Sequence, residues 1–160
     1  MPRHFEILHA YWHSLADGAA PDHVLVEPGP ILALLPYLMF VEFEENPFRV
    51  RYRLSGSKLD YITNIDLTGR YLDEFGDGPR AQAVAVLTEH YMKCRDLGQP
   101  VYGAYTWPDI AGDVWAVEFA LFPLLVKGQV RRCLAIESYG FDLTEQGAGP
   151  ALDARLPRFS

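Results

Sequence analysis

Residues 34–70 read LLPYLMFVEFEENPFRVRYRLSGSKLDYITNIDLTGR and decide the fold of this 160-residue chain. Polar and apolar side chains alternate over residues 38–44 and again over residues 49–54. This is the period of a strand with one buried and one solvated face. The four residues between the two runs, 45–48, make a turn. The sequence therefore predicts a β-hairpin, which a short, glycine-containing crossover follows.

The register of this hairpin follows from placing Glu44 opposite Arg49. Three further pairs then face each other across the strands: Phe43 and Val50, Glu42 and Arg51, Val41 and Tyr52. Acids meet bases on one face and apolar side chains meet on the other, so the charged side is the expected outer face. The same register sets Arg53 opposite Phe40 with no acid directly across, which makes Arg53 the better candidate for a partner contact.

The helical segments begin after the hairpin. The segment Asp66-Leu67-Thr68-Gly69-Arg70 offers Thr68 as the expected N-cap of a short helix through Phe75. The longest helix is expected between Pro79, in its first turn, and Gly98, just past its end. Its apolar stripe recurs at spacings of three, four and three residues and should lie across the sheet: Val84, Leu87, Tyr91, Cys94. Three antiparallel strands should follow, near residues 101–107, 114–125 and 130–139.

Several separated segments together resemble a family of small, single-domain bacterial PAS proteins. The shared pattern is a hairpin that ends in Arg-Tyr-Arg-Leu-x-Gly, here residues 51–56, followed by Asp-x-Thr-Gly-Arg, here residues 66–70. The resemblance covers residues 24–141 and departs upstream of Pro36, where this chain has acidic residues in place of an arginine-rich leader. It implies an α+β fold: a five-stranded antiparallel sheet with a long helix and short helices on one face and an N-terminal amphipathic helix. It implies a sensory or interaction domain and names no ligand.

The chain is expected to divide into an N-terminal amphipathic helix (1–20), a PAS-like domain (21–143) and a flexible C-terminal tail (144–160). In the helix predicted over residues 3–16, an apolar stripe recurs at spacings of three, four and three: Phe5, Leu8, Trp12, Leu15. This stripe either covers only the outer face of the same chain's sheet or also packs on a second copy. We favour the second alternative, so these four residues are the candidates for a homodimer interface.

Charge and hydropathy limit the partners. The chain has 14 basic and 21 acidic residues, a net charge of −7, which argues against direct binding to nucleic acid or to an anionic membrane. No apolar run approaches the length of a membrane span, and charged residues and histidines interrupt the N-terminal stretch, so a cytoplasmic protein is expected. Cys94 and Cys133 lack the spacing of a metal site and are predicted to be free, buried thiols.

The sequence gives little support for a metal or cofactor site. His9 and His13 share a helix face, yet no third ligand is spaced to complete a metal site. Some haem-binding PAS domains carry a ligating histidine on the helix that holds His90, but the local sequence matches no such motif. A hydrogen-bonded histidine at the border of the core is therefore preferred for His90. The string at residues 93–96, Lys-Cys-Arg-Asp, shares only Cys-Arg with the reactive-cysteine motif of flavin photoreceptors, so neither haem nor flavin is supported.

No catalytic residue is assigned. Glu118 and Glu137 would form a carboxylate pair if their strands aligned, but each alternates with apolar neighbours. Such alternation is typical of the solvent side of an antiparallel sheet, so both glutamates are expected to face water. No nucleophile elbow, phosphate loop or metalloprotease helix occurs in the sequence.

The remaining candidate site is a cavity between the long helix, the short helices and the inner face of the sheet. Eight residues could line it, mostly aromatic side chains with polar ends: Tyr52, Tyr61, Tyr71, Phe75, His90, Tyr91, Tyr105, Phe119. A tyrosine-rich, fully packed core would give the same pattern. The predicted function is a non-enzymatic, sensory PAS-type domain that binds a small ligand or a partner protein and acts through dimerisation and a separate effector protein.

Two alternatives remain open from the sequence. One is an enzyme on a cone-shaped α+β fold of the ketosteroid-isomerase type, which an inward-facing Asp or Glu beside a buried tyrosine would support. The other is a dimerisation module that binds no ligand.

Overall fold

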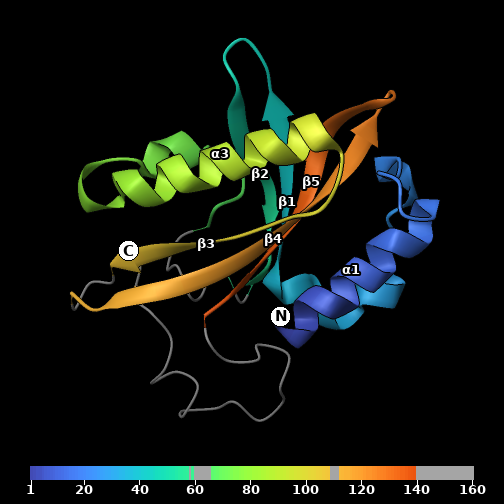
Figure 1. Ribbon diagram of the computed structural model, residues 1–160, viewed down its shortest axis with the longest axis horizontal. Helices are drawn as coiled ribbons and strands as arrows, with labels where there is room; N and C mark the ends of the chain where they lie inside the picture. The colour runs from blue at the N-terminus through green and yellow to red at the C-terminus, as the bar shows by residue number, and fades with distance from the viewer. Residues whose placement is uncertain (58, 60–65, 109–111, 140–160) are drawn as a thin grey trace.

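A single antiparallel sheet of five strands, in the order β2-β1-β5-β4-β3, organises the fold (Figure 1). The computed structural model describes residues 1–57, 59, 66–108 and 112–139. Its strands are β1 (Leu38–Glu44), β2 (Arg49–Ser55), β3 (Val101–Pro108), β4 (Val114–Val126) and β5 (Gln129–Ser138). Both predicted groups of strands join one sheet through the pairing of β1 with β5. The predicted α+β class with five antiparallel strands is confirmed.

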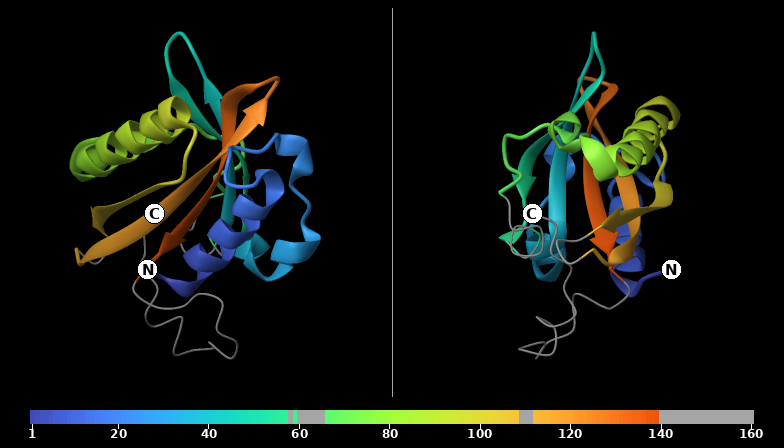
Figure 2. Two further views of the ribbon diagram at one scale, coloured as in Figure 1. Left: turned by 45° about the vertical axis from the view of Figure 1, so that its right-hand side comes forward. Right: turned by 90° about the vertical axis from the view of Figure 1, so that its left-hand side faces the viewer.

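Helices cover both faces of this sheet (Figures 1 and 2). One face carries the long helix α3 (Ala81–Leu97) with the short helices η3 (Leu72–Phe75) and η4 (Gly78–Arg80). The opposite face carries α1 (Arg3–Ala16), η1 (His23–Leu25) and η2 (Gly29–Tyr37). We call the face under α3 the inner face and the face under α1 the outer face. Each has its own cluster of buried apolar side chains.

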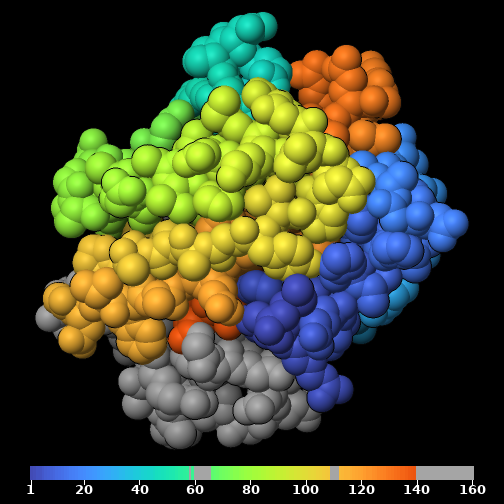
Figure 3. All heavy atoms as spheres, viewed as in Figure 1, coloured from blue at the N-terminus to red at the C-terminus, as the bar shows by residue number. Residues whose placement is uncertain are grey.

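The long helix lies where the sequence predicts it. All four residues of its predicted stripe, Val84, Leu87, Tyr91 and Cys94, are buried against the inner face. The helix ends at Gly98, whose left-handed backbone caps it by donating a hydrogen bond to the Cys94 carbonyl. On the surface, α3 and β3 lie side by side (Figure 3). Both cysteines are free, buried thiols, as predicted.

The first hairpin has the predicted register from Val41–Tyr52 to Glu44–Arg49. Beyond it a bulge between Phe40 and Val41 shifts the pairing, so Phe40 faces Leu54. The prediction that Arg53 faces Phe40 is therefore wrong. Within the described hairpin no acid lies directly across from Arg53, but its Nη1 donates to Glu42 Oε2 at 2.5 Å. Arg49 likewise reaches past its cross-strand acid to the carboxylate of Asp73 in η3, at 2.7 and 2.8 Å.

The Asp-x-Thr-Gly-Arg segment pairs with the edge strand β2. Gly69 N donates to the Tyr52 carbonyl (2.6 Å), and Tyr52 N donates to the Arg70 carbonyl (2.9 Å). Gly69 has a φ of +83°, a conformation that glycine adopts without steric cost. The prediction that Thr68 caps a helix is wrong, because its Oγ1 accepts from Ser55 N at 3.3 Å. The helical turn starts later, with Tyr71 as the N-cap.

The position of Gly56 explains why the Arg-Tyr-Arg-Leu-x-Gly motif ends in glycine. Its N–H donates to the Leu38 carbonyl at 2.8 Å, which brings the end of β2 against the start of β1. A Cβ at this position would lie 2.2 Å from the Pro36 carbonyl oxygen, too close for any side chain. The glycine therefore allows the closest backbone approach at this corner of the sheet.

The N-terminal helix packs on the chain's own sheet. Phe5, Leu8 and Trp12 are 2%, 0% and 1% exposed on the outer face, and Leu15 is half-buried. The Trp12 indole donates to the Pro123 carbonyl at 2.8 Å, which fixes α1 over β4. In the single chain the predicted interface stripe is thus largely buried in cis. The additional packing on a second copy stays a prediction. The predicted tail, residues 144–160, lies outside the described residues. Among the described helices, none is long and apolar enough to cross a membrane.

Candidate functional site: an internal cavity with a buried carboxyl group

A cavity of about 60 Å³ lies between α3, the η3–η4 segment and the inner face of the sheet. All five strands contribute to its walls. Among the described residues that line it, all but Phe75 and Arg80 are buried, so these two mark a place where it approaches the surface. A buried water needs about 10–15 Å³ of such volume, so the cavity has room for about four waters or a small organic group.

The carboxyl group of Glu137 on β5 is the most unusual feature of this cavity. The residue is only 7% exposed, and Phe119 faces it directly on the neighbouring strand. Tyr139 donates a hydrogen bond to Oε1 at 3.0 Å, and Tyr105 donates to Oε2. Both tyrosines are buried. The carboxyl group is therefore held in place by two hydroxyl donors inside an apolar enclosure.

Burial sets the electrostatics of this group. Loss of water raises the pKa of Glu137, and the hydrogen bonds from Tyr105 and Tyr139 only partly oppose that rise. Burial also raises the pKa of both tyrosines well above the usual value, so they remain neutral donors. Within the described part of the chain, no cationic side chain is among the groups that lower the pKa of Glu137.

Aromatic rings form most of the remaining wall. Tyr105 contacts Phe119 and Trp107, with ring centroids 5.9 and 6.0 Å apart. Tyr52 and Tyr91 are buried as well, and burial raises the pKa of both hydroxyl groups. At the more exposed side, the Arg80 guanidinium lies 5.1 Å from the centroid of the Trp107 ring. The described part of the lining thus combines aromatic faces, one acid and one peripheral base.

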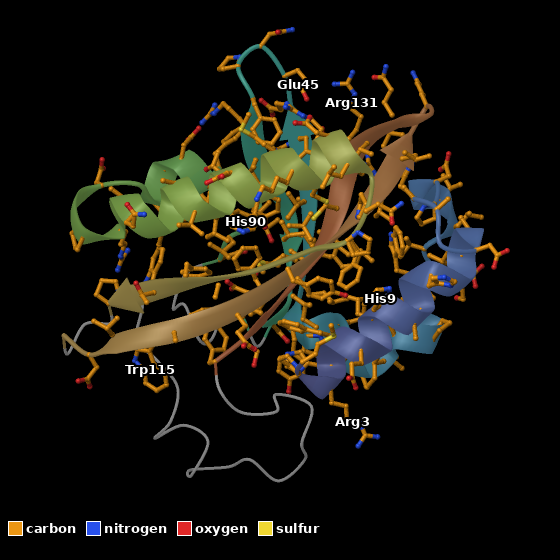
Figure 4. All side chains as sticks on the ribbon, in the orientation of Figure 1. Arg3, His9, Glu45, His90, Trp115 and Arg131 are labelled. Carbon is orange, nitrogen blue, oxygen red and sulfur yellow. The ribbon has the colours of Figure 1, made fainter. Side chains whose placement is uncertain are left out.

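Five of the eight residues predicted for the pocket line this cavity: Tyr52, Phe75, Tyr91, Tyr105 and Phe119. Tyr71 does not, because its hydroxyl donates to Glu44 on the outer face and Arg49 lies 3.6 Å from its ring centroid. His90 lies between α3 and the sheet (Figure 4), with Nδ1 2.7 Å from the Val86 carbonyl and its ring edge-on to Phe119, outside the cavity lining. Tyr61 is outside the described residues.

The sequence reasoning missed two groups of lining residues. The first is apolar: Met39, Leu67, Leu72, Leu87, Leu121 and Ala135. The second carries polar atoms: Arg80, Trp107 and Glu137.

The expected exposure of Glu137 is wrong. Its apolar neighbour Ile136 is buried under α1, so both faces of β5 are covered and alternation does not identify a solvent side. Glu118 is exposed, as expected, and is paired with Ser138, on the opposite face from Glu137. The two glutamates therefore form no carboxylate pair. The sequence feature that could have indicated a buried Glu137 is Tyr139, which lies two residues further along and on the same face.

Comparison with known proteins identifies the family. The sequence matches a PAS domain family over residues 2–135. The chain belongs to the PAS domain family. No curated protein matches the sequence. The cone-shaped alternative fold is wrong, because α3 separates the two groups of strands as in a PAS domain.

Two solved structures of VqmA agree with this PAS fold. A VqmA–ligand–DNA complex from Vibrio cholera is 15% identical, with a TM-score of 0.52 over 68% of this chain and 47% of that chain. VqmA bound to DPO gives the same identity, TM-score and coverage of this chain, over 54% of its own. This PAS chain thus spans about half the length of VqmA. A light-oxygen-voltage domain with a flavin analogue is 14% identical, with a TM-score of 0.48 over 74% of this chain and 84% of that chain.

The described lining does not match the cofactor chemistry weighed from the sequence. Cys94 and Cys133 are buried but line no part of this PAS cavity, and His90 is also outside its lining. The described residues around the cavity thus present a carboxyl group, hydroxyl groups, an indole and a guanidinium, with no thiol or imidazole.

Proposed function

We propose that this PAS domain is a sensor that binds a small molecule in its inner cavity and transmits binding to a partner protein. The observation that carries the proposal is the buried carboxyl group of Glu137 facing a cavity lined by aromatic side chains. Pockets that bind small molecules combine apolar walls with a few fixed polar groups. This cavity has both.

The energetics favour binding over simple packing. Removing a carboxyl group from water costs free energy, and a core selected only for stability would carry an apolar side chain at this position. Space beside the group adds a further cost, because the wall atoms lose their packing partners there. Ionisable groups whose pKa is shifted by burial gather at functional sites.

The route from cavity to partner is proposed to pass through the η3–η4 segment. Phe75 and Arg80 belong to both the cavity wall and the surface, so a ligand that moves them changes what a partner contacts. Dimerisation remains part of the proposal. Because Phe5, Leu8 and Trp12 are buried in cis, a dimer through α1 would use the exposed side of this helix or exchange the helix between copies.

Two alanine-to-valine variants, one inside the cavity and one outside it, test ligand binding. Ala135 lines the cavity on β5, whereas Ala120 is buried in the outer cluster away from it. Ala135→Val should fill space that a ligand needs and leave stability nearly unchanged, while Ala120→Val should overpack and destabilise by about 1–3 kcal/mol. Native mass spectrometry of the purified protein and thermal shifts with a library of small polar compounds then report binding.

The expected result is a bound mass or a thermal shift in the natural protein and in Ala120→Val, lost in Ala135→Val. The proposal fails if the natural protein retains no small molecule and responds to no compound. It also fails if Ala135→Val binds as well as the natural protein.

An acid–base enzyme is a second candidate, and one observation favours it. Glu137 faces inward beside the buried hydroxyl of Tyr105, the arrangement that would suit proton transfer. The two functions differ in what leaves the site. A sensor returns its ligand unchanged, whereas an enzyme releases a chemically altered compound, which mass spectrometry of the supernatant distinguishes.

A further inference from the structure

The acceptor capacity of Glu137 limits what kind of ligand can sit beside it. An ionised carboxylate has about four lone-pair sites on its two oxygens. Tyr139 donates to one oxygen and Tyr105 to the other, which leaves further acceptor sites on both. When this carboxyl group is ionised, a ligand that approaches this end of the cavity must therefore bring hydrogen-bond donors rather than acceptors.

The charges around the cavity also favour a ligand that brings donors, and a positively charged one in particular. Among the described residues that line the cavity, Glu137 is the single acid, and its partners Tyr105 and Tyr139 are neutral donors. The lining base, Arg80, lies over Trp107 and is not among the groups that shift the pKa of Glu137. An anionic ligand would place a second negative charge beside a desolvated carboxylate, whereas a cation would compensate it.

The walls near Glu137 suit a cation with a hydrocarbon body. Phe119 is its direct cross-strand neighbour, and the ring of Tyr105 lies against that of Phe119. The faces of aromatic rings attract cations, by about 0.5–2 kcal/mol for each favourable contact. The apolar side chains of Leu87 and Leu121 complete the wall and would pack against methyl groups.

We propose that the cavity selects a small protonated amine, whose ammonium group donates to Glu137 and whose short apolar body packs against the aromatic wall. This assignment rests on the proposed sensor function and names the ligand class of the same site. The cavity volume of about 60 Å³ limits an unstrained ligand to about four to six non-hydrogen atoms. The ammonium group supplies donors for the remaining acceptor sites of Glu137 and a positive charge beside it.

Three probes of nearly equal shape test the class: isobutylamine, isobutanol and isobutyrate. Titrations followed by NMR shifts of the natural protein at pH 7.5 give the three dissociation constants. We expect the amine to bind about tenfold or more tightly than the alcohol, because its hydrogen bonds are charge-assisted. Isobutyrate should bind more weakly than either.

Two isosteric variants assign the preference to a residue. Glu137→Gln removes the charge in the cavity, and Glu118→Gln makes the same change on the exposed side of the neighbouring strand. The preference for the amine should vanish in Glu137→Gln and persist in Glu118→Gln. Retained binding of isobutanol shows that Glu137→Gln is folded, and loss of all probe binding in Ala135→Val places the binding in the cavity.

The outcomes separate this inference from the sensor proposal. If isobutanol or isobutyrate binds as tightly as the amine, or if Glu137→Gln keeps the preference, the ligand class is wrong and the sensor proposal stands. If no probe binds the natural protein and no small molecule copurifies with it, both are wrong. The comparison of the three probes on the natural protein decides the class even if a variant fails to fold.

Discussion

Each face of the sheet is covered by a layer of helices, but the two layers differ in how they are packed. On the outer face, α1 is fixed by buried side chains such as Leu8, and the Trp12 indole is satisfied by a backbone carbonyl. On the inner face, α3 covers a cavity that contains the carboxyl group of Glu137. The difference teaches that the two layers pack differently: one closes the core, and the other retains the space and charge that the proposed binding function needs.

A pair of equal truncations should give the largest effects. Leu8 is fully buried on the outer face, whereas Leu87 borders the cavity and has fewer packing partners there. Leu8→Ala should cost about 4–5 kcal/mol and Leu87→Ala about 2–3 kcal/mol, the two ends of the range for leucine truncation. Denaturant unfolding of both variants with an unchanged slope measures the difference. Equal losses would show that the two faces are packed alike.

Removing one hydroxyl from each of two tyrosine–glutamate pairs should have an intermediate effect. Tyr139 donates to the buried Glu137, and Tyr71 donates to Glu44 on the solvent side. Tyr139→Phe should cost about 1.5–3 kcal/mol, because a hydrogen bond to a desolvated acid is lost. Tyr71→Phe should cost clearly less, since water replaces its hydroxyl. The comparison between the faces is wrong if thermal unfolding ranks these variants in the opposite order.

The pH dependence of stability should distinguish Glu137 from the surface acids. Its folded pKa is raised above the ordinary 4.5, so the folded state binds the proton more tightly than the unfolded state. The contribution of Glu137 to the unfolding free energy of the natural protein therefore falls as pH rises from about 4.5 through the folded pKa. Asp73, whose pKa Arg49 lowers, acts in the opposite direction.

Glu137→Gln removes the pH dependence that comes from Glu137 and leaves that of Asp73 in place. The difference in unfolding free energy between this variant and the natural protein should shift in favour of the variant as pH rises across that window. Glu118→Gln, on the exposed side of β4, should give a difference that stays nearly constant. Urea unfolding at a series of pH values measures both. A constant difference for Glu137→Gln would mean that this carboxyl group is not desolvated in the folded protein.

Local patterns in the sequence predicted most of the fold. Alternation and paired charges gave the hairpin register from Val41 to Glu44, and helix caps and spacing gave α3 with its buried stripe. Three local assignments failed because a tertiary contact replaced the local one. Thr68 bonds to Ser55 rather than capping a helix, and a bulge brings Arg53 to Glu42.

The third failure, Glu137, concerns the candidate site itself. Alternation separates a polar from an apolar face, but a strand covered on both faces has no solvent side for the polar residue. Only the approach of Tyr105 and Tyr139 explains how the carboxyl group is accommodated. Much of the aromatic half of the site could thus be predicted from the sequence, whereas the alternation rule placed its acid on the wrong side.

The smallest effect is expected on the solvent side of the first hairpin. Arg53 donates to Glu42, and its side chain is 44% exposed. Exposed ion pairs contribute about 0–1 kcal/mol and are screened by salt. Arg53→Ala should therefore lower the unfolding free energy by less than about 1 kcal/mol, with a smaller loss in 1 M NaCl, and should leave amine binding unchanged. A larger loss, or a change in binding, would extend the functional region from the inner face to the edge of the sheet and contradict the separation of the two faces.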